Sequence, residues 1–196
     1  MSDNFRFDVI AAGFSGDTAI ALSALTHEDG MVRASALRAL ARIGTLTEEI
    51  LLPFIRDAHN EVRRTAVELA ATFPAVSVHQ CLDDSDIFVA EMTAWCLGER
   101  TSVSDIEINA LIDRTTSHTE AIVREACAAA LGSLGDERGL SAILAACSDK
   151  PAVRRRAILA LAPFEGDEVE AALQRALEDK DWQVRQNAED LLNPRG

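Results

Sequence analysis

The chain has 196 residues, of which 48% are hydrophobic and 5% aromatic, and 32 acidic against 19 basic residues give a formal net charge of −13. This composition excludes a disordered chain, and no apolar run approaches the ~18 residues of a membrane span. Acidic residues outnumber basic ones in both halves of the chain. This excess disfavours nucleic acids and anionic lipids as partners, because both are bound through their negatively charged groups. The first residues lack the pattern of a signal peptide, so we expect a cytoplasmic protein with no membrane partner.

The predicted elements are helices that come in pairs. One helix over residues 5–14 precedes the pairs, and we expect it to cover the first pair. First helices are expected over 17–25, 47–55, 75–82, 105–112, 140–146 and 167–177. The third is the weakest, since it follows Pro74 and contains Val76 and Val78. Good N-cap residues stand at the start of four of these helices: Asp17, Thr47, Asp105 and Asp167.

Each second helix is marked by a valine near its start. These marker valines are Val32, Val62, Val89, Val123, Val153 and Val184. Apolar or small residues stand 4, 7, 8 and 11 positions after most of them, which places one face of each helix in a core. The sequence therefore predicts an all-α fold, a right-handed α-solenoid of about six two-helix repeats plus an N-terminal capping helix. We expect residues 1–196 to form a single domain.

An arginine follows five of the six marker valines, and Ala90 replaces it in the third repeat. The loop before each second helix is acidic, with Asp57, Asp84 and Asp179 at matching positions. We expect these loop residues to cap the second helices and to pair with the arginines, which is a structural role rather than a binding one.

The recurring pattern acid-x-x-x-Val-Arg-x-x-Ala-x-x-Ala-Leu-x-x-Leu-Gly resembles the short HEAT repeat of the phycobilisome-lyase type. The resemblance covers roughly residues 15–196 and is weakest in the third repeat, where Arg100 takes an apolar position. It implies an α-solenoid. It says little about function, because proteins with such repeats range from chromophore lyases to regulatory scaffolds.

No catalytic, cofactor or metal site is predicted. The four cysteines contain no C-x-x-C pair, so we expect buried thiols in a reducing compartment. HEAT-repeat hydroxylases of the deoxyhypusine type need several His-Glu pairs, and this chain has one, at residues 27–28. We expect His27, His59 and His118 to act as loop caps, and the protein not to be an enzyme.

The second helices are expected to line a shallow, smooth concave groove with positions 2, 6 and 9 after each valine. Trp95 and Leu159 fall near its centre; whether Trp95 is exposed or packed stays open, and Trp182 is expected to pack. The candidate protein-binding residues are Arg38, Arg64, Glu91, Trp95, Arg155 and Leu159.

These residues favour a non-enzymatic scaffold or adaptor that binds a protein or peptide on its concave face. The alternatives are a phycobilin-lyase-like or chaperone-like factor and, against the net charge, a nucleic-acid-binding protein similar to the DNA-alkylation-repeat glycosylases. The sequence leaves the oligomeric state open.

Overall fold

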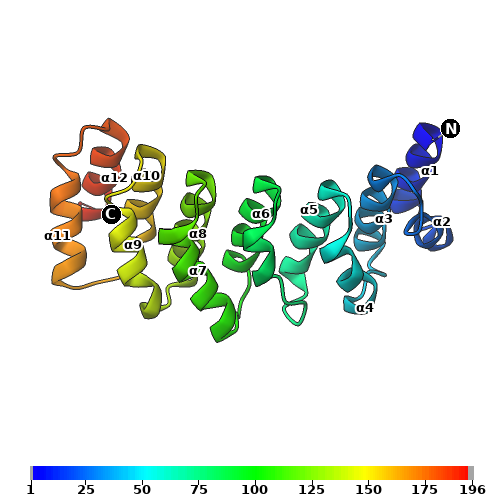
Figure 1. Cartoon of the computed structure of the whole chain (residues 1–196), viewed down its shortest axis with the longest axis horizontal. Helices are drawn as coiled ribbons and strands as arrows, with labels where there is room; N and C mark the ends of the chain where they lie inside the picture. Colours follow the sequence, from blue (N-terminus) through cyan, green and yellow to red (C-terminus); the bar gives the residue numbers. More distant parts are fainter. Residues whose placement is uncertain (1, 194–196) are drawn as a thin grey trace.

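The computed structural model describes residues 2–193, which form twelve α-helices and no strand. Helix α1 (Ser2–Ser15) comes first, and six two-helix units follow it. Figure 1 shows the units side by side in a curved row, with both ends raised above the middle. The second helices occupy the upper, inner side of this curve and the first helices the lower, outer side. The all-α solenoid predicted from the sequence is confirmed.

The first helices of the units differ in length and regularity. They are α2 (Thr18–Ala24), α4 (Glu48–Leu51) continued by a 3₁₀ turn over Leu52–Arg56, a 3₁₀ turn over His79–Asp83, α7 (Asp105–Ser117), α9 (Leu140–Ala146) and α11 (Asp167–Ala176). The helix expected over 75–82 is wrong: the third unit has only the five-residue 3₁₀ turn, and the segment after Pro74 that contains Val76 and Val78 is not helical.

The second helices are more uniform. They are α3 (Gly30–Ile43), α5 (Asn60–Leu69), α6 (Ile87–Gly98), α8 (Ala121–Leu134), α10 (Pro151–Ala160) and α12 (Trp182–Leu192). Each begins two residues before its marker valine, and all six valines are buried. The hydrophobic core continues from Val9 in α1 to Ala188 in α12. No helix in the described part of the chain is both long and apolar enough to cross a membrane.

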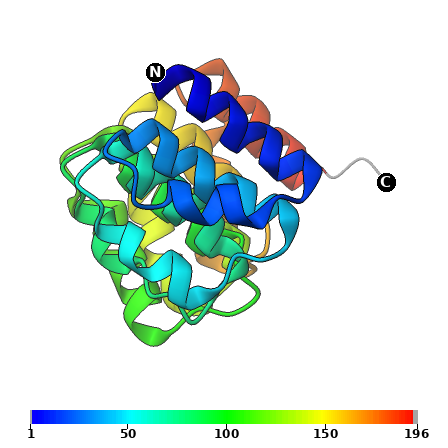
Figure 2. The same cartoon turned by 90° about the vertical axis from the view of Figure 1, so that its right-hand side faces the viewer.

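Helix α1 covers the open side of the first unit, as expected. Figure 2 looks along the array from this end and shows α1 lying across the first pair. Val9 and Ala12 of α1 are buried, and Arg6 Nε of the same helix donates to Ser35 Oγ of α3 at 3.1 Å. A Cβ on Gly13 would lie 3.0 Å from the Cα of Ala39, so the two helices are in close contact.

Two of the four predicted N-caps are correct, since Asp17 and Thr47 accept bonds from backbone N–H groups of α2 and α4. The other two are wrong by one residue, because α7 is capped by Ser104 and α11 is preceded by Gly166. Ser104 and Glu107 form a reciprocal capping box, which leaves Asp105 as the first helical residue.

The row of small residues nine positions after the valines was expected to line a smooth groove, and this interpretation needs correction. A Cβ on Gly98 would lie 2.9 Å from the Cα of Ala130, and one on Gly132 would lie 2.6 Å from the Cα of Ala160. These glycines let α6, α8 and α10 approach closely, so they set the spacing of the helices. Ala34, two positions after Val32, is also buried rather than part of the groove.

Candidate binding site on the second-helix face

The loops of neighbouring units are joined by bidentate arginine–aspartate pairs, which we call the arginine ladder. Each arginine reaches the aspartate of the next unit, whereas the sequence suggested only that arginine and acid would pair. The pairs are Arg33–Asp57, Arg63–Asp84, Arg124–Asp149 and Arg154–Asp179. All are largely shielded from solvent, so the ladder is a structural device.

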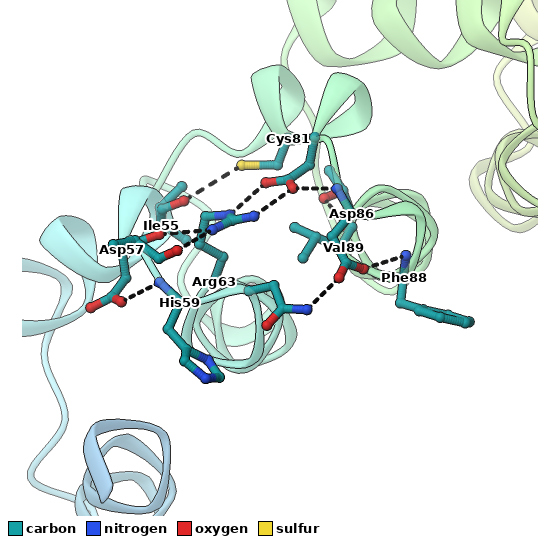
Figure 3. A network of polar contacts seen from close by, with 12 residues as sticks. Ile55, Asp57, His59, Arg63, Cys81, Asp86, Phe88 and Val89 are labelled. Atoms are coloured by element: carbon teal, nitrogen blue, oxygen red, sulfur yellow. Dashed lines mark hydrogen bonds and ion pairs between the residues drawn. The ribbon is translucent and has the colours of Figure 1, made fainter. Parts of the chain in front are cut away.

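Figure 3 shows one rung of the ladder between the second and third units. Arg63 Nε and Nη2 donate to the two carboxylate oxygens of Asp84 at 2.7 and 2.8 Å, while Nη1 donates to the carbonyl of Asp57 in its own loop at 2.9 Å. Asp84 also accepts from the N–H of Asp86, which in turn caps α6. One guanidinium thereby fixes the two loops and the start of the next helix.

The ladder is interrupted between the third and fourth units. Ala90 stands where the arginine would be, and His118 stands where the aspartate would be. A different link joins these units: Arg114 of α7 donates to both carboxylate oxygens of Asp83 at 2.6 and 2.8 Å, on a more exposed surface.

A buried ion pair lies beside the same junction. Arg100 Nη1 donates to Glu107 at 2.7 Å, and Nη2 donates to the carbonyls of Val76 and Ala70 at 2.7 and 3.1 Å. Both side chains are almost fully buried, and Glu107 also accepts from Ser104. Arg100 therefore ties the irregular third unit to the loop before it and to α7.

A hollow opens on the second-helix face at this junction. Trp95 is 46% exposed, which settles the question that the sequence left open. It forms one side of a cavity of about 410 Å³ between α6 and α8. The remaining lining residues are Glu91, Gly98, Glu99, Ile122, Glu125, Ala126, Ala129, Ala130, Ser133 and Arg156 of α10.

The sequence explains why the hollow lies here. Trp95, Ala129 and Leu159 occupy the same position, six after the valine, in three successive second helices. The tryptophan and the leucine are large and exposed, whereas the alanine between them is small. Ala126 is also small, so the surface of α8 is low beside the indole of Trp95.

The predicted binding residues are only partly brought together. Trp95 and Glu91 line the hollow, and Leu159 is 43% exposed on α10. Arg38 and Arg64 both pair with Glu61 at the N-terminal part of the row, and Arg155 pairs with Asp181 of the last unit.

Sequence reasoning missed Glu99, Glu125 and Arg156, which complete the charged rim of the hollow. Glu99 and Arg156 stand at repeat positions that were not expected to face the groove. Glu125 stands two positions after Val123, in a row that was expected to be exposed.

The cysteines and histidines have structural roles. Burial raises the pKa of Cys81, Cys96 and Cys147 to about 11, and that of Cys127 to about 12, so these thiols are protonated near neutral pH.

The imidazoles of three loops, His27, His59 and His118, accept from backbone N–H groups two residues further on, as expected of loop caps. Over residues 2–193, no three His, Cys, Asp or Glu side chains are grouped so as to hold a metal ion.

Comparisons with known families identify repeats along most of the array. A model of HEAT repeats matches residues 48–132, and a model of the PBS lyase HEAT-like repeat matches residues 123–149 and 153–179. No curated protein sequence matches the chain.

Several solved structures with a similar architecture are designed repeat proteins. One is a designed armadillo repeat protein in complex with the peptide (KR)4, 18% identical, with a TM-score of 0.63 over 88% of this chain and 96% of that one. Another belongs to computationally designed armadillo repeat proteins for modular peptide recognition, 17% identical, with a TM-score of 0.57 over 94% and 97%. At this identity the likeness shows the fold alone.

Proposed function

Because the chain is a HEAT-repeat protein, we propose that it is a non-enzymatic scaffold that binds a protein or peptide segment along its second-helix face. The observation that carries this proposal is the exposed apolar row of Trp95 and Leu159 beside a hollow of about 410 Å³. Half-exposed tryptophans next to small residues and arginines are typical of the few side chains that dominate binding energy.

The charged and reactive groups outside this face support the same assignment, because most of them are shielded from solvent. The arginine ladder uses its charged groups internally. Three of the four thiols are buried, as expected, whereas Cys147 is only partly buried. The free thiols are consistent with a reducing compartment such as the cytoplasm. Peptide binding by the designed armadillo protein is consistent with such a face serving as a binding surface.

The experiment is selection of ligands from a displayed random peptide library on the immobilised protein, followed by calorimetric Kd measurements. We expect Trp95→Ala to weaken the selected peptides about thirtyfold, the effect of losing about 2 kcal/mol at an interface hot spot. Leu159→Ala should have a smaller effect in the same direction.

The matched control is Trp182→Ala. The structure exposes 64% of Trp182, contrary to the packing expected from the sequence, yet it lines none of the hollows around Trp95. We expect this variant to bind within twofold of the native protein. Equal losses in the two tryptophan variants, or none in Trp95→Ala, would contradict the proposed binding face.

A factor in pigment attachment is the second candidate, because residues 123–149 and 153–179, from α8 to α11, match the PBS lyase HEAT-like repeat. This candidate predicts that the protein retains a visible absorbance after co-expression with enzymes of bilin synthesis and purification. The scaffold that we propose should be purified colourless from the same cells.

A further inference from the structure

The hollow beside Trp95 carries an excess of negative charge that is not neutralised internally. Glu91, Glu99 and Glu125 line it, and Arg156 is the only basic residue among its lining residues. Arg156 Nε lies 3.7 Å from Glu125 Oε1, a loose contact. Within residues 2–193, the carboxylates of Glu91 and Glu99 have no ion pair or side-chain hydrogen bond.

A second hollow lies between α6 and α5. It has a volume of about 250 Å³ and is lined by Glu68, Glu91, Met92 and Trp95. Glu91 and Trp95 therefore border both hollows, whereas Glu68 of the second hollow pairs with Arg38. In the larger hollow, the exposed indole of Trp95 and the nearby carboxylates of Glu91, Glu99 and Glu125 offer a cation a ring face and charge partners at the same site.

We propose that this site binds an arginine or lysine side chain of an extended basic peptide, with Trp95 as the aromatic wall and Glu91, Glu99 and Glu125 as the charge partners. This inference rests on the proposed function, and it names the chemistry of the peptide.

Three physical arguments favour a cationic side chain. Tryptophan is the best aromatic partner for a cation, and a guanidinium stacks on it while its N–H groups reach carboxylates. An apolar side chain in the hollow would shield the free glutamates from water without pairing them, which costs free energy. An acidic side chain would face three like charges.

The volume of the hollow and the net charge of the protein agree with this assignment. A cavity of about 410 Å³ lies at the lower end of the range for ligand pockets, about 300–1,000 Å³, so it has room for one long side chain. The net charge of −13 raises the local concentration of basic segments and repels acidic ones.

The test uses Trp182→Phe, which leaves Trp95 as the only tryptophan. The probes are the peptides (Lys-Arg)4, (Ser-Gly)4 and (Asp-Glu)4, and the readout is the emission of Trp95 during titration. We expect a saturable change with (Lys-Arg)4 and none with the other two.

Charge-matched variants separate this site from the general acidity of the protein. In the Trp182→Phe background, the triple variant Glu91→Gln, Glu99→Gln, Glu125→Gln should weaken (Lys-Arg)4 at least tenfold. The control triple variant Glu137→Gln, Glu170→Gln, Glu189→Gln removes the same charge from exposed positions elsewhere and should weaken it less than threefold. Arg156→Gln should strengthen binding severalfold, an effect that loss of folding cannot mimic.

Equal weakening by the two triple variants, or an unchanged Trp95 emission, would overturn the assignment. If library-selected peptides bind through Trp95 but lack basic residues and tolerate the first triple variant, the proposed function stands and this inference fails. If no peptide binds the second-helix face at all, both fail.

Discussion

The junctions that carry the arginine ladder differ from the junction between the third and fourth units. A bidentate, shielded rung links the loops of units one and two, two and three, four and five, and five and six. The third and fourth units have no rung, because Ala90 and His118 replace its arginine and its aspartate. The exposed Arg114–Asp83 pair and the buried Arg100–Glu107 pair are found instead. The same junction contains the hollow beside Trp95. In this array the regular repeats are linked by the ladder, and the departure from the repeat coincides with the binding surface that we propose.

The buried pair gives the clearest way to test how the irregular junction is held. Glu107→Ala would leave the guanidinium of Arg100 buried without its carboxylate, and such losses cost about 3–5 kcal/mol. We expect the free energy of unfolding in urea, followed by circular dichroism, to fall by that amount. In Glu107→Gln, which keeps an oxygen acceptor, the free energy of unfolding should fall less. A loss under about 1 kcal/mol in Glu107→Ala would show that the pair does not hold the junction.

Close helix contacts should matter at both kinds of junction. Gly132→Ala at a ladder junction and Gly98→Ala at the irregular one would each force a Cβ into the backbone of the next helix. Overpacking of this kind costs about 1–3 kcal/mol, partly offset by the better helix propensity of alanine. Gly132→Ala should lower the thermal midpoint more, because its contact is shorter. Ser141→Ala, at an exposed position of α9, is the control and should change stability by less than about 0.5 kcal/mol.

The links themselves can be compared by double-mutant cycles. For Arg154 and Asp179, whose side chains are 18% and 15% exposed, we expect a coupling of about 1 kcal/mol. For Arg114 and Asp83, which are 29% and 56% exposed, we expect less than about 0.5 kcal/mol. Equal couplings in urea unfolding would mean that the substitute link is as strong as a rung of the ladder.

The ladder also predicts how stability depends on pH. Hydrogen bonds from Arg124 and Arg154 lower the pKa of Asp149 and Asp179, respectively, although burial opposes the shift. A carboxyl whose pKa is lower in the folded state stabilises the fold above its unfolded pKa of about 3.9, and this contribution disappears as the pH falls through the folded pKa. We therefore expect stability in urea to decrease between about pH 5 and about pH 2. In Asp179→Asn, stability should decrease less steeply over this pH range. Glu170→Gln, on the exposed side of α11, should show the same pH dependence of stability as the native protein.

The sequence was a good guide to positions that are repeated within the chain. Burial of one residue per unit, the marker valine, is enough to fix the register of all six second helices. It was a poorer guide wherever the outcome depends on two units at once. The exposure of Trp95 follows from the small Ala129 of the next helix, and the burial around Gly98 follows from Ala130.

One such signal was present in the sequence. The third unit lacks the arginine, since Ala90 takes its place, and the fourth unit has His118 in place of an aspartate. The loss of both partners in successive units indicates that each arginine pairs with an acid of the next unit. The buried Arg100–Glu107 pair gave no comparable signal, because its partners include the carbonyls of Ala70 and Val76, which any residue type would supply.

The interrupted ladder has a mechanical consequence. The rungs lie along the loops, so they resist splaying of one unit from the next, and resistance is least where the only link at the surface is an exposed one. We therefore expect the loop side of this junction to open more readily than that of a ladder junction, although the buried Arg100–Glu107 pair still holds its interior. A side chain bound in the hollow, as proposed above, would bridge α6 and α8 at the junction that has no rung.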